Sequence, residues 1–177
     1  MIPSLLVTSR LYLRSFCEND VETLYHNYCS DIERSRFLTR EPHTDSNQTL
    51  DFLLKWCHSA WEKKSSEFAW IIALKSTNEA IGISLVILEE HKAQIHYGIN
   101  RDYERQGFIT EAGFAITEWL KSKTKIREIW TLCDVENYGS INVLHKLGFS
   151  NLGVLKSELN LPAFGNEPRD CFLFKLG

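Results

Sequence analysis

Residues 97–111 read YGINRDYERQGFITE, and this stretch says most about the fold. A strand pattern ends here, a loop with Gly107 follows, and a helical pattern starts near Phe108. The first turn of a helix offers N–H groups without intrahelical partners and the positive end of the helix dipole. Gly107 permits close approach of the backbone to a ligand, while Arg105 adds a cation and Thr110 a hydroxyl. The stretch is therefore either a cradle for a diphosphate or an ordinary strand-to-helix loop with a glycine turn.

A second junction of the same kind follows at residues 134–149, DVENYGSINVLHKLGF. Asn137 and Ser140 are residue types that cap helix starts, and Gly148 is a good helix stop. A capped amphipathic helix accounts for this stretch on its own. If the two strands are neighbours in a sheet, however, a ligand can lie between their ends with its phosphates on the first helix.

The remaining apolar patterns give the order of the elements. Helical spacing appears at residues 21–28, 45–64, 108–123 and 137–147. Strand patterns appear at residues 11–16, 68–74, 80–88, 93–99, 126–134, 152–156 and 171–176. The strands at 68–74 and 80–88 are so apolar that we expect both their faces to be covered. This order predicts a mixed α/β layer fold with antiparallel meanders flanked by helices.

Composition limits the class of protein. The chain has 177 residues, of which 44% are hydrophobic and 24% charged, and we expect one domain over residues 1–177. A net charge of −3 disfavours direct nucleic-acid binding, and the longest apolar stretch, 80–88, is too short to span a membrane. The five cysteines are scattered and include no C-x-x-C motif, which favours a reducing compartment over a disulfide framework. The N-terminus also lacks a signal-peptide pattern, so we expect a cytoplasmic protein. His26 and Cys29 have no further metal ligands beside them, so we expect no metal site.

The two junctions, in this order and spacing, resemble a known family. Residues 93–99, AQIHYGI, followed by 103–112, YERQGFITEA, resemble the central motif of the GNAT superfamily of N-acetyltransferases. Glu136-Asn137-x-x-Ser140 and the later LHKLGF resemble the next motif of the branch that contains the ribosomal-protein N-terminal (alanine) acetyltransferases. The opening Thr8-x-Arg10-Leu-x-Leu-Arg and Asp170 also fit, so the resemblance covers nearly the whole chain.

This resemblance implies a fold and an activity. The fold would be α/β, with a mixed, mostly antiparallel central sheet of about six to seven strands, flanked by about four helices, whose central strands splay apart. The activity would be transfer of acetyl from acetyl-CoA to a primary amine by direct attack, in a monomer or homodimer. The acceptor would be a protein N-terminal amine or a small amine. The alternative is a CoA-binding sensor or interaction module without turnover.

The resemblance also assigns residues to the cosubstrate. The main-chain amides at the helix start would hold the diphosphate, and Arg105 would be a nearby cation. The residues that would supply these amides are Gln106, Gly107, Phe108, Ile109 and Thr110. The edge of the strand at 93–99, including Gly98 and Ile99, would pair with the pantetheine arm, and Asn137 would bind that arm from the other side. A backbone N–H near Gly98–Ile99 would stabilise the oxyanion that forms during transfer.

Two residues are candidates for proton transfer. Ser140 either donates a proton to the leaving thiolate or only caps its helix. His96 is the nearest candidate base, because histidine titrates near neutrality, and the alternative is a strand histidine hydrogen-bonded to a neighbour. Glu67 and Glu111 are further candidates, although Glu111 also suits the positive end of the helix dipole.

Glu104, Ile109 and Gln94 depart from the pattern of the family, and Leu144 departs from that of other GNAT enzymes but is usual in this branch. Glu104 would repel a diphosphate unless it points outward, and Ile109 would narrow the helix start. Leu144 stands where other GNAT enzymes have a tyrosine acid, and Gln94 where many relatives have a glutamate. An α-amino group, with a pKa near ~8, needs less help from a base than a lysine or polyamine amine near ~10.4. Gln94 therefore favours a low-pKa amine, or a base elsewhere.

Overall fold

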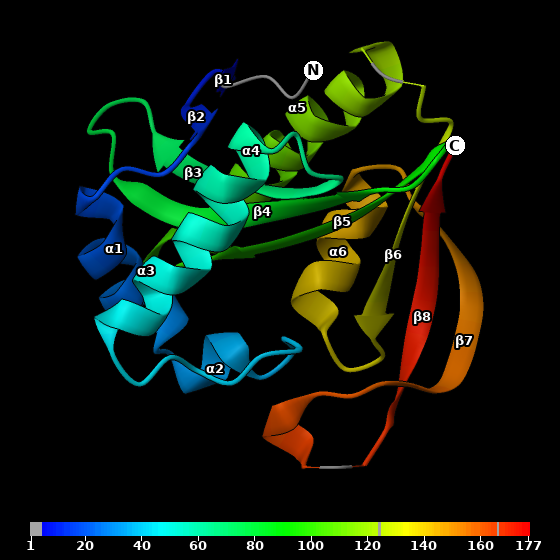
Figure 1. Cartoon of the computed structure of the whole chain (residues 1–177). Coiled ribbons are helices and arrows are strands. Elements are labelled where there is room, and N and C mark those ends of the chain that lie inside the picture. Colours follow the sequence, from blue (N-terminus) through cyan, green and yellow to red (C-terminus); the bar gives the residue numbers. More distant parts are fainter. Residues whose placement is uncertain (1–4, 124, 166) are drawn as a thin grey trace.

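The computed structural model describes residues 5–123, 125–165 and 167–177, and its strands form one sheet (Figure 1). This eight-stranded sheet has the order β1-β2-β3-β4-β5-β6-β8-β7. All neighbours are antiparallel except β5 and β6, which are parallel. The strands are β1 (Leu5–Val7), β2 (Leu11–Arg14), β3 (Glu67–Leu74), β4 (Ala80–Leu88), β5 (Lys92–Ile99), β6 (Glu128–Asp134), β7 (Ser150–Leu159) and β8 (Arg169–Leu176).

Four helical regions lie where the apolar spacing predicts them, and the short helix α2 is an addition that the sequence did not predict. The N-terminal ones are α1 (Asn19–Leu24), α2 (Ile32–Ser35), α3 (Ser46–Leu54) and α4 (Ala60–Glu62), and the later ones are α5 (Phe108–Lys123) and α6 (Tyr138–Lys146). The π-helical turns η1 (Tyr25–Cys29) and η2 (Lys55–Ser59) continue α1 and α3, and the 3-10 turns are η3 (Arg101–Tyr103) and η4 (Pro162–Phe164). Asp45 caps α3, because its Oδ1 accepts a hydrogen bond from Gln48 N at 3.1 Å.

Two apolar cores cover the two faces of the sheet. Phe68, Trp70 and Ile72 of β3 face the core that contains residues of α5 and α6, whereas Ala69 and Ile71 face the core beneath the N-terminal helices (Figure 1). Both faces of β3 are therefore buried, as its continuous apolar run predicts. Figure 1 shows the helices α1, α3 and α4 on the near side of the sheet.

The parallel pair β5–β6 is incomplete. The two strands pair only where Lys92–Gln94 meet Glu128–Trp130. Beyond that point β5 stays paired with β4 up to Ile99, and β6 stays with β8 up to Asp134, so the strands diverge (Figure 1). We call residues 95–99 of β5 and 131–134 of β6 the diverging segments. They confirm the expected splay of the central strands.

The α/β fold is confirmed, with two differences at the edges of the sheet. The structure adds β1, a strand of three residues that pairs with β2. This strand was not predicted because three residues are too few to form a recognisable alternating pattern. β7 extends beyond the expected 152–156, because an edge strand exposed along its length carries no apolar alternation. Residues 1–4 of the N-terminal stretch examined for a signal peptide lie outside the described residues. Among the helices that the structure describes, none is long and apolar enough to cross a membrane.

Candidate active site between β5 and β6

The start of α5 presents free amides beside the end of β5. Within the described residues, the first main-chain bond donated at this end runs from Glu111 N to Gly107 O, at 2.9 Å. The five preceding N–H groups, from Gln106 to Thr110, have no main-chain acceptor among those residues. Gly107 has φ +80°, a conformation that disfavours any side chain. This loop therefore has the features of an anion cradle, as the sequence predicts.

Ile109 does not narrow this cradle. Its side chain is buried in the core together with that of the preceding Phe108. The two side chains thus anchor the first turn of α5 and leave its amides to carry any contact with an anion. Arg105, with φ +58°, is exposed beside the same turn.

Arg10 supplies a cation at the cradle that the sequence did not reveal as a site residue. Its Nη1 donates to Gln106 O at 3.0 Å, and its Nη2 lies 3.5 Å from where a Cβ on Gly107 would stand. Its guanidinium stacks 4.2 Å from the centre of the Phe108 ring, and its Nε donates to Glu111 Oε2 at 2.7 Å. The signal was present in the motif around Thr8 and Arg10, but nothing in the sequence places that motif against α5.

Glu111 is occupied by this arrangement. Partial burial alone would raise its pKa, but hydrogen bonds from Thr8 and Arg10 outweigh burial and hold the pKa below its ordinary value. The ionised carboxylate therefore orients Arg10 and fastens the N-terminal hairpin to α5. This engagement favours the structural interpretation of Glu111 over a role as base.

Glu104 does not leave an uncompensated negative charge on the loop. Its carboxylate accepts a hydrogen bond from the Arg34 guanidinium, just beyond the middle of α2. A second ion pair, Arg101 to Asp31 at 3.3 Å, joins the same two segments. The residue that departs most from the family pattern is thus neutralised, and it also ties the cradle loop to α2.

The main-chain groups of Tyr97 and Ile99 face the diverging side of β5. The Gly98 carbonyl points toward β4, because a Cβ on Gly82 would lie 2.3 Å from it. The His96 carbonyl also points there and accepts Ser84 Oγ at 3.1 Å. Since successive residues of a strand direct their main-chain groups to opposite edges, those of Tyr97 and Ile99 face away from β4. Ile99 therefore directs its main-chain groups to the unpaired side of β5, whereas Gly98 lies in the same segment with its carbonyl turned to β4.

Tyr97 joins the diverging segment of β5 to the first turn of α6. Its hydroxyl lies 2.9 Å from Ser140 Oγ and donates to Ser140 O at 3.2 Å. Ser140 N in turn donates to Oδ1 of Asn137, the N-cap of α6, at 3.1 Å. Burial raises the pKa of Tyr97, so the phenol stays protonated. The predicted Asn137 and Ser140 thus lie at the expected helix start, and Tyr97 joins them as a contact that sequence reasoning missed.

His96 lies beyond the last β5 residue that pairs with β6, is still paired with Leu85 of β4, and directs its side chain to the face of the sheet opposite that of Tyr97. Its neighbours on that face are Gln94 and Gly98, and the hydroxyl of buried Tyr28 lies where a Cβ on Gly98 would be. Burial lowers the pKa of His96, so the imidazole is neutral near pH 7. No described residue hydrogen-bonds its ring, so the neighbour expected of a merely structural histidine is not found among these residues.

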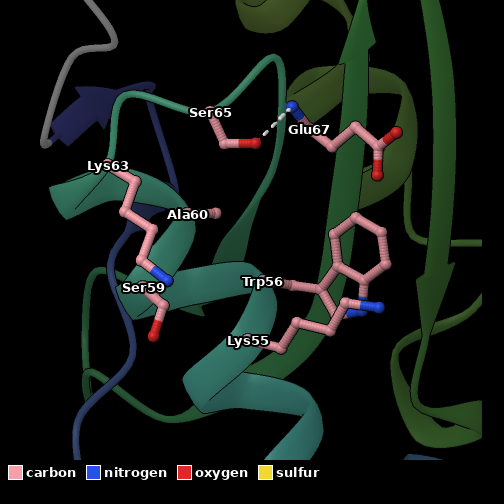
Figure 2. Close-up of a pocket in the computed structure, with 7 residues that line it drawn as sticks. All are labelled: Lys55, Trp56, Ser59, Ala60, Lys63, Ser65 and Glu67. Atoms are coloured by element: carbon pink, nitrogen blue, oxygen red, sulfur yellow. Dashed lines mark hydrogen bonds between the residues drawn. The ribbon is translucent and has the colours of Figure 1, made fainter.

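Glu67 lies apart from His96. It pairs with Ile87 of β4, which pairs with Gln94, so one whole strand separates Glu67 from β5. Its side chain is exposed at the rim of a hollow formed with Trp56 and Lys63, where its N–H donates to Ser65 Oγ at 3.2 Å (Figure 2). This hollow lies against α4 and the start of β3, away from the cradle. Across residues 5–123, 125–165 and 167–177, no group of three or more His, Cys, Asp or Glu side chains could hold a metal ion.

Comparison with known proteins decides the family. Residues 10–150 match the family model described as acetyltransferase (GNAT) domain. The chain belongs to this GNAT family. It is 29% identical over 154 residues to the uncharacterized N-acetyltransferase p20 of Bacillus licheniformis, covering 85% of each chain.

Solved GNAT structures share the fold. An acetyltransferase (GNAT family) from Bacillus anthracis superposes with a TM-score of 0.84 at 23% identity, over 97% of each chain. RimL, a ribosomal L7/L12 alpha-N-protein acetyltransferase solved in complex with coenzyme A, superposes with a TM-score of 0.82 at 19% identity, over 97% of this chain and 96% of its own. The resemblance seen in the sequence is thereby confirmed, and the protein is an N-acetyltransferase whose donor is acetyl-CoA.

Proposed function

We propose that this GNAT enzyme acetylates a primary amine, on a protein N-terminus or a small molecule, by direct attack on acetyl-CoA bound along the diverging segments. The observation that supports this most is the run of free amides from Gln106 to Thr110 at the end of β5. A diphosphate satisfies these N–H groups, and Arg10 and Arg105 add positive charge beside it. The remainder of the cosubstrate then lies along the edge of β5 that β6 leaves unpaired.

Along that edge, the main-chain groups of Tyr97 and Ile99 are the ones that a pantetheine arm can pair with as a strand does. Asn137 lies at the end of the opposite diverging segment, where it caps α6. The N–H of Ile99 is available to stabilise negative charge on the acetyl oxygen, because it is fixed by the pairing of β5 with β4.

The amine approaches from the face that carries His96. An amine attacks only in its neutral form, so a neutral imidazole in reach of the diverging segments is suited to accept its proton. Gln94, on the same face, has an uncharged amide side chain that cannot accept the proton of the amine. His96 is therefore the proposed base, and the absence of a carboxylate favours acceptors of lower pKa, such as α-amino groups.

The leaving thiolate requires a proton, and we assign it to the Tyr97–Ser140 pair. Ser140 Oγ is the donor and regains its proton from solvent, while the protonated Tyr97 phenol at 2.9 Å orients the serine hydroxyl. Leu144 cannot serve, because it is an apolar side chain buried in the core. The assignment explains why a tyrosine hydroxyl is directed at a serine whose N–H is already capped by Asn137.

The test follows thiol release and thermal stability together. Purified protein is mixed with acetyl-CoA and a panel of amines, amino acids and short peptides with free N-termini. Acceptor-dependent thiol release, with a rise in melting temperature on adding acetyl-CoA, is the expected result. A stabilised protein without turnover on the whole panel would instead favour a CoA-binding module, and no response to acetyl-CoA would reject both functions.

A further inference from the structure

Three buried polar atoms without hydrogen-bond partners lie close together in the sequence. They are Arg34 Nε, Ser35 Oγ and Arg40 Nη2, and they are the complete set of such side-chain atoms among the described residues. Buried polar groups are normally satisfied, and an unpaired one costs free energy unless something else binds it. Arg34 and Arg40 both act on the hydroxyl of Tyr28, so these two side chains lie near one point, and a ligand with several hydrogen-bond acceptors there would satisfy their unpaired atoms.

Arg40 is held firmly in this region. Its Nη1 donates to Cys29 O at 3.2 Å and to Glu41 O at 2.9 Å. Its guanidinium also lies 5.7 Å from the centre of the Tyr28 ring and 5.9 Å from that of Phe52. These contacts fix the guanidinium and leave Nη2 as its unsatisfied side.

The positive charge of Arg40 has no carboxylate partner. Among the described residues, no acidic side chain lies within ion-pair distance of it, whereas Arg34 is paired with Glu104. Burial and the nearby Arg40 lower the pKa of His43 to about 4, so this neighbour is neutral. Tyr28 is neutral too, since burial raises its pKa to about 12. An anion is therefore what the site lacks.

The site lies on the acceptor side of the proposed reaction centre. The Tyr28 ring that Arg40 contacts places its hydroxyl against Gly98, on the face that carries His96. The positive charges of Arg34 and Arg40 both act on that hydroxyl, opposing the effect of burial on its pKa. Arg34 also reaches the cradle loop through Glu104. A molecule with its amine near Gly98 would thus have another of its groups directed toward Arg40.

We propose that Arg40, with Arg34 Nε and Ser35 Oγ, binds an anionic oxygen group of the acceptor. This inference rests on the proposed function. The acceptor class is a small amine that carries a carboxylate or a phosphate a few bonds from its amino group. A guanidinium suits both anions, because its planar N–H groups match their oxygens in pairs. A polyamine, which carries only positive charge, is excluded as a good acceptor by repulsion from Arg40.

The test compares matched acceptors with and without the anion. Amino acids are paired with their amides, phosphoethanolamine with ethanolamine, and acidic dipeptides with their neutral counterparts. We expect kcat/KM to be about 10- to 100-fold higher for at least one small anionic class than for its neutral match. Equal values within every pair would overturn the proposal, and a preference confined to the dipeptides would overturn the small-molecule acceptor.

Variants connect the preference to Arg40. Arg40→Gln should lower kcat/KM far more for the anionic member of each pair than for its neutral match, and Arg40→Lys should retain part of the difference between them. Arg127→Gln, an exposed arginine before β6, is the matched control and should keep the full preference. An equal loss with charged and neutral acceptors in Arg40→Gln would overturn the assignment.

A binding measurement separates this inference from the proposed function. N-acetylated amino acids and their amides are titrated by calorimetry into the protein saturated with CoA. Tighter binding of the acid to the wild type but not to Arg40→Gln supports the anion site even if no turnover is found. Absence of any such preference, with turnover intact, would overturn the anion site alone.

Discussion

The Tyr97 hydroxyl on β5 lies 2.9 Å from Ser140 Oγ on α6, so a side-chain hydrogen bond joins β5 to α6 beyond the point where β5 stops pairing with β6. The first turn of one helix is thereby fixed to the strand that leads to the other. The predictions below begin with this pair.

Tyr97→Phe and Ser140→Ala should each lower kcat by about 10- to 100-fold, because each interrupts proton supply to the leaving thiolate. Acetyl-CoA affinity should change little. The double variant should be only slightly slower than the worse single one, since the two groups act as a unit. Steady-state kinetics and calorimetry measure both quantities. Tyr138→Phe on the same helix, where the side chain is 70% exposed, is the control, and unchanged turnover in Ser140→Ala would exclude Ser140 as the proton donor.

Gly107→Arg should abolish the rise in melting temperature that acetyl-CoA causes. The position has φ +80°, and a long side chain there would occupy the space beside the free amides. Gly153→Arg is a matched control, because Gly153 also has a positive φ, at +114°, but lies on β7 with no atom near its Cβ position. A retained shift in Gly107→Arg would refute the placement of the diphosphate.

Arg34→Ala should weaken acetyl-CoA binding about 3- to 10-fold, because it leaves Glu104 unpaired beside the phosphates. Adding Glu104→Gln should restore most of the affinity. Both effects should diminish as ionic strength rises, since the charges are partly exposed. Calorimetry at two salt concentrations checks this, and a double variant as weak as Arg34→Ala would contradict the compensation of charge.

The pH dependence of kcat/KM should contain an acid limb below pH 6.5. A base acts only when deprotonated, and burial lowers the pKa of His96, so activity from this group is full above its pKa and falls as the pH drops through it. The acceptor amine adds a rise near its own pKa, about 8 for an α-amino group. The ratio of wild type to His96→Asn removes that second effect, and a ratio independent of pH would exclude His96 as the base.

Two glycines should respond oppositely to alanine. A Cβ on Gly82 would lie 2.3 Å from Gly98 O and 3.0 Å from Ile99 Cα, so Gly82→Ala should cost about 1–3 kcal/mol of unfolding free energy. Gly139 lies in α6 with its nearest atom 3.9 Å away, and Gly139→Ala should add about 0.5–1 kcal/mol. Urea unfolding measures both, and an undamaged Gly82→Ala would mean that β4 and β5 can move apart.

Elements with a long apolar pattern were predictable from the sequence. The observed bounds of β4 and α5 agree with the predicted ones. These elements contain nine and sixteen residues, which is long enough for an apolar pattern to be recognised. The three residues of β1 and the exposed β7 gave no such signal. The cradle was also predictable, since it depends on local geometry around Gly107.

Contacts between distant segments were not predictable in this way. Arg10 reaches Gln106 and Arg34 reaches Glu104, and nothing local to those residues indicates the partner. The same holds for Tyr97 and Ser140, which lie 43 residues apart. For Ile109, the simpler argument was the better one. Its apolar side chain predicts burial, which the structure shows, whereas comparison with the family pattern suggested that it would narrow the anion cradle.

The early end of β5–β6 pairing also has a consequence for the lifetime of the protein. The unpaired edges of β5 and β6 lack main-chain hydrogen bonds that a continuous sheet would make, and in the proposed binding mode acetyl-CoA replaces some of them while it is bound. A ligand that binds the native state and not the unfolded chain raises stability by mass action. Resistance to proteolysis should therefore follow the abundance of acetyl-CoA, so that starved cells degrade this enzyme faster than well-fed ones.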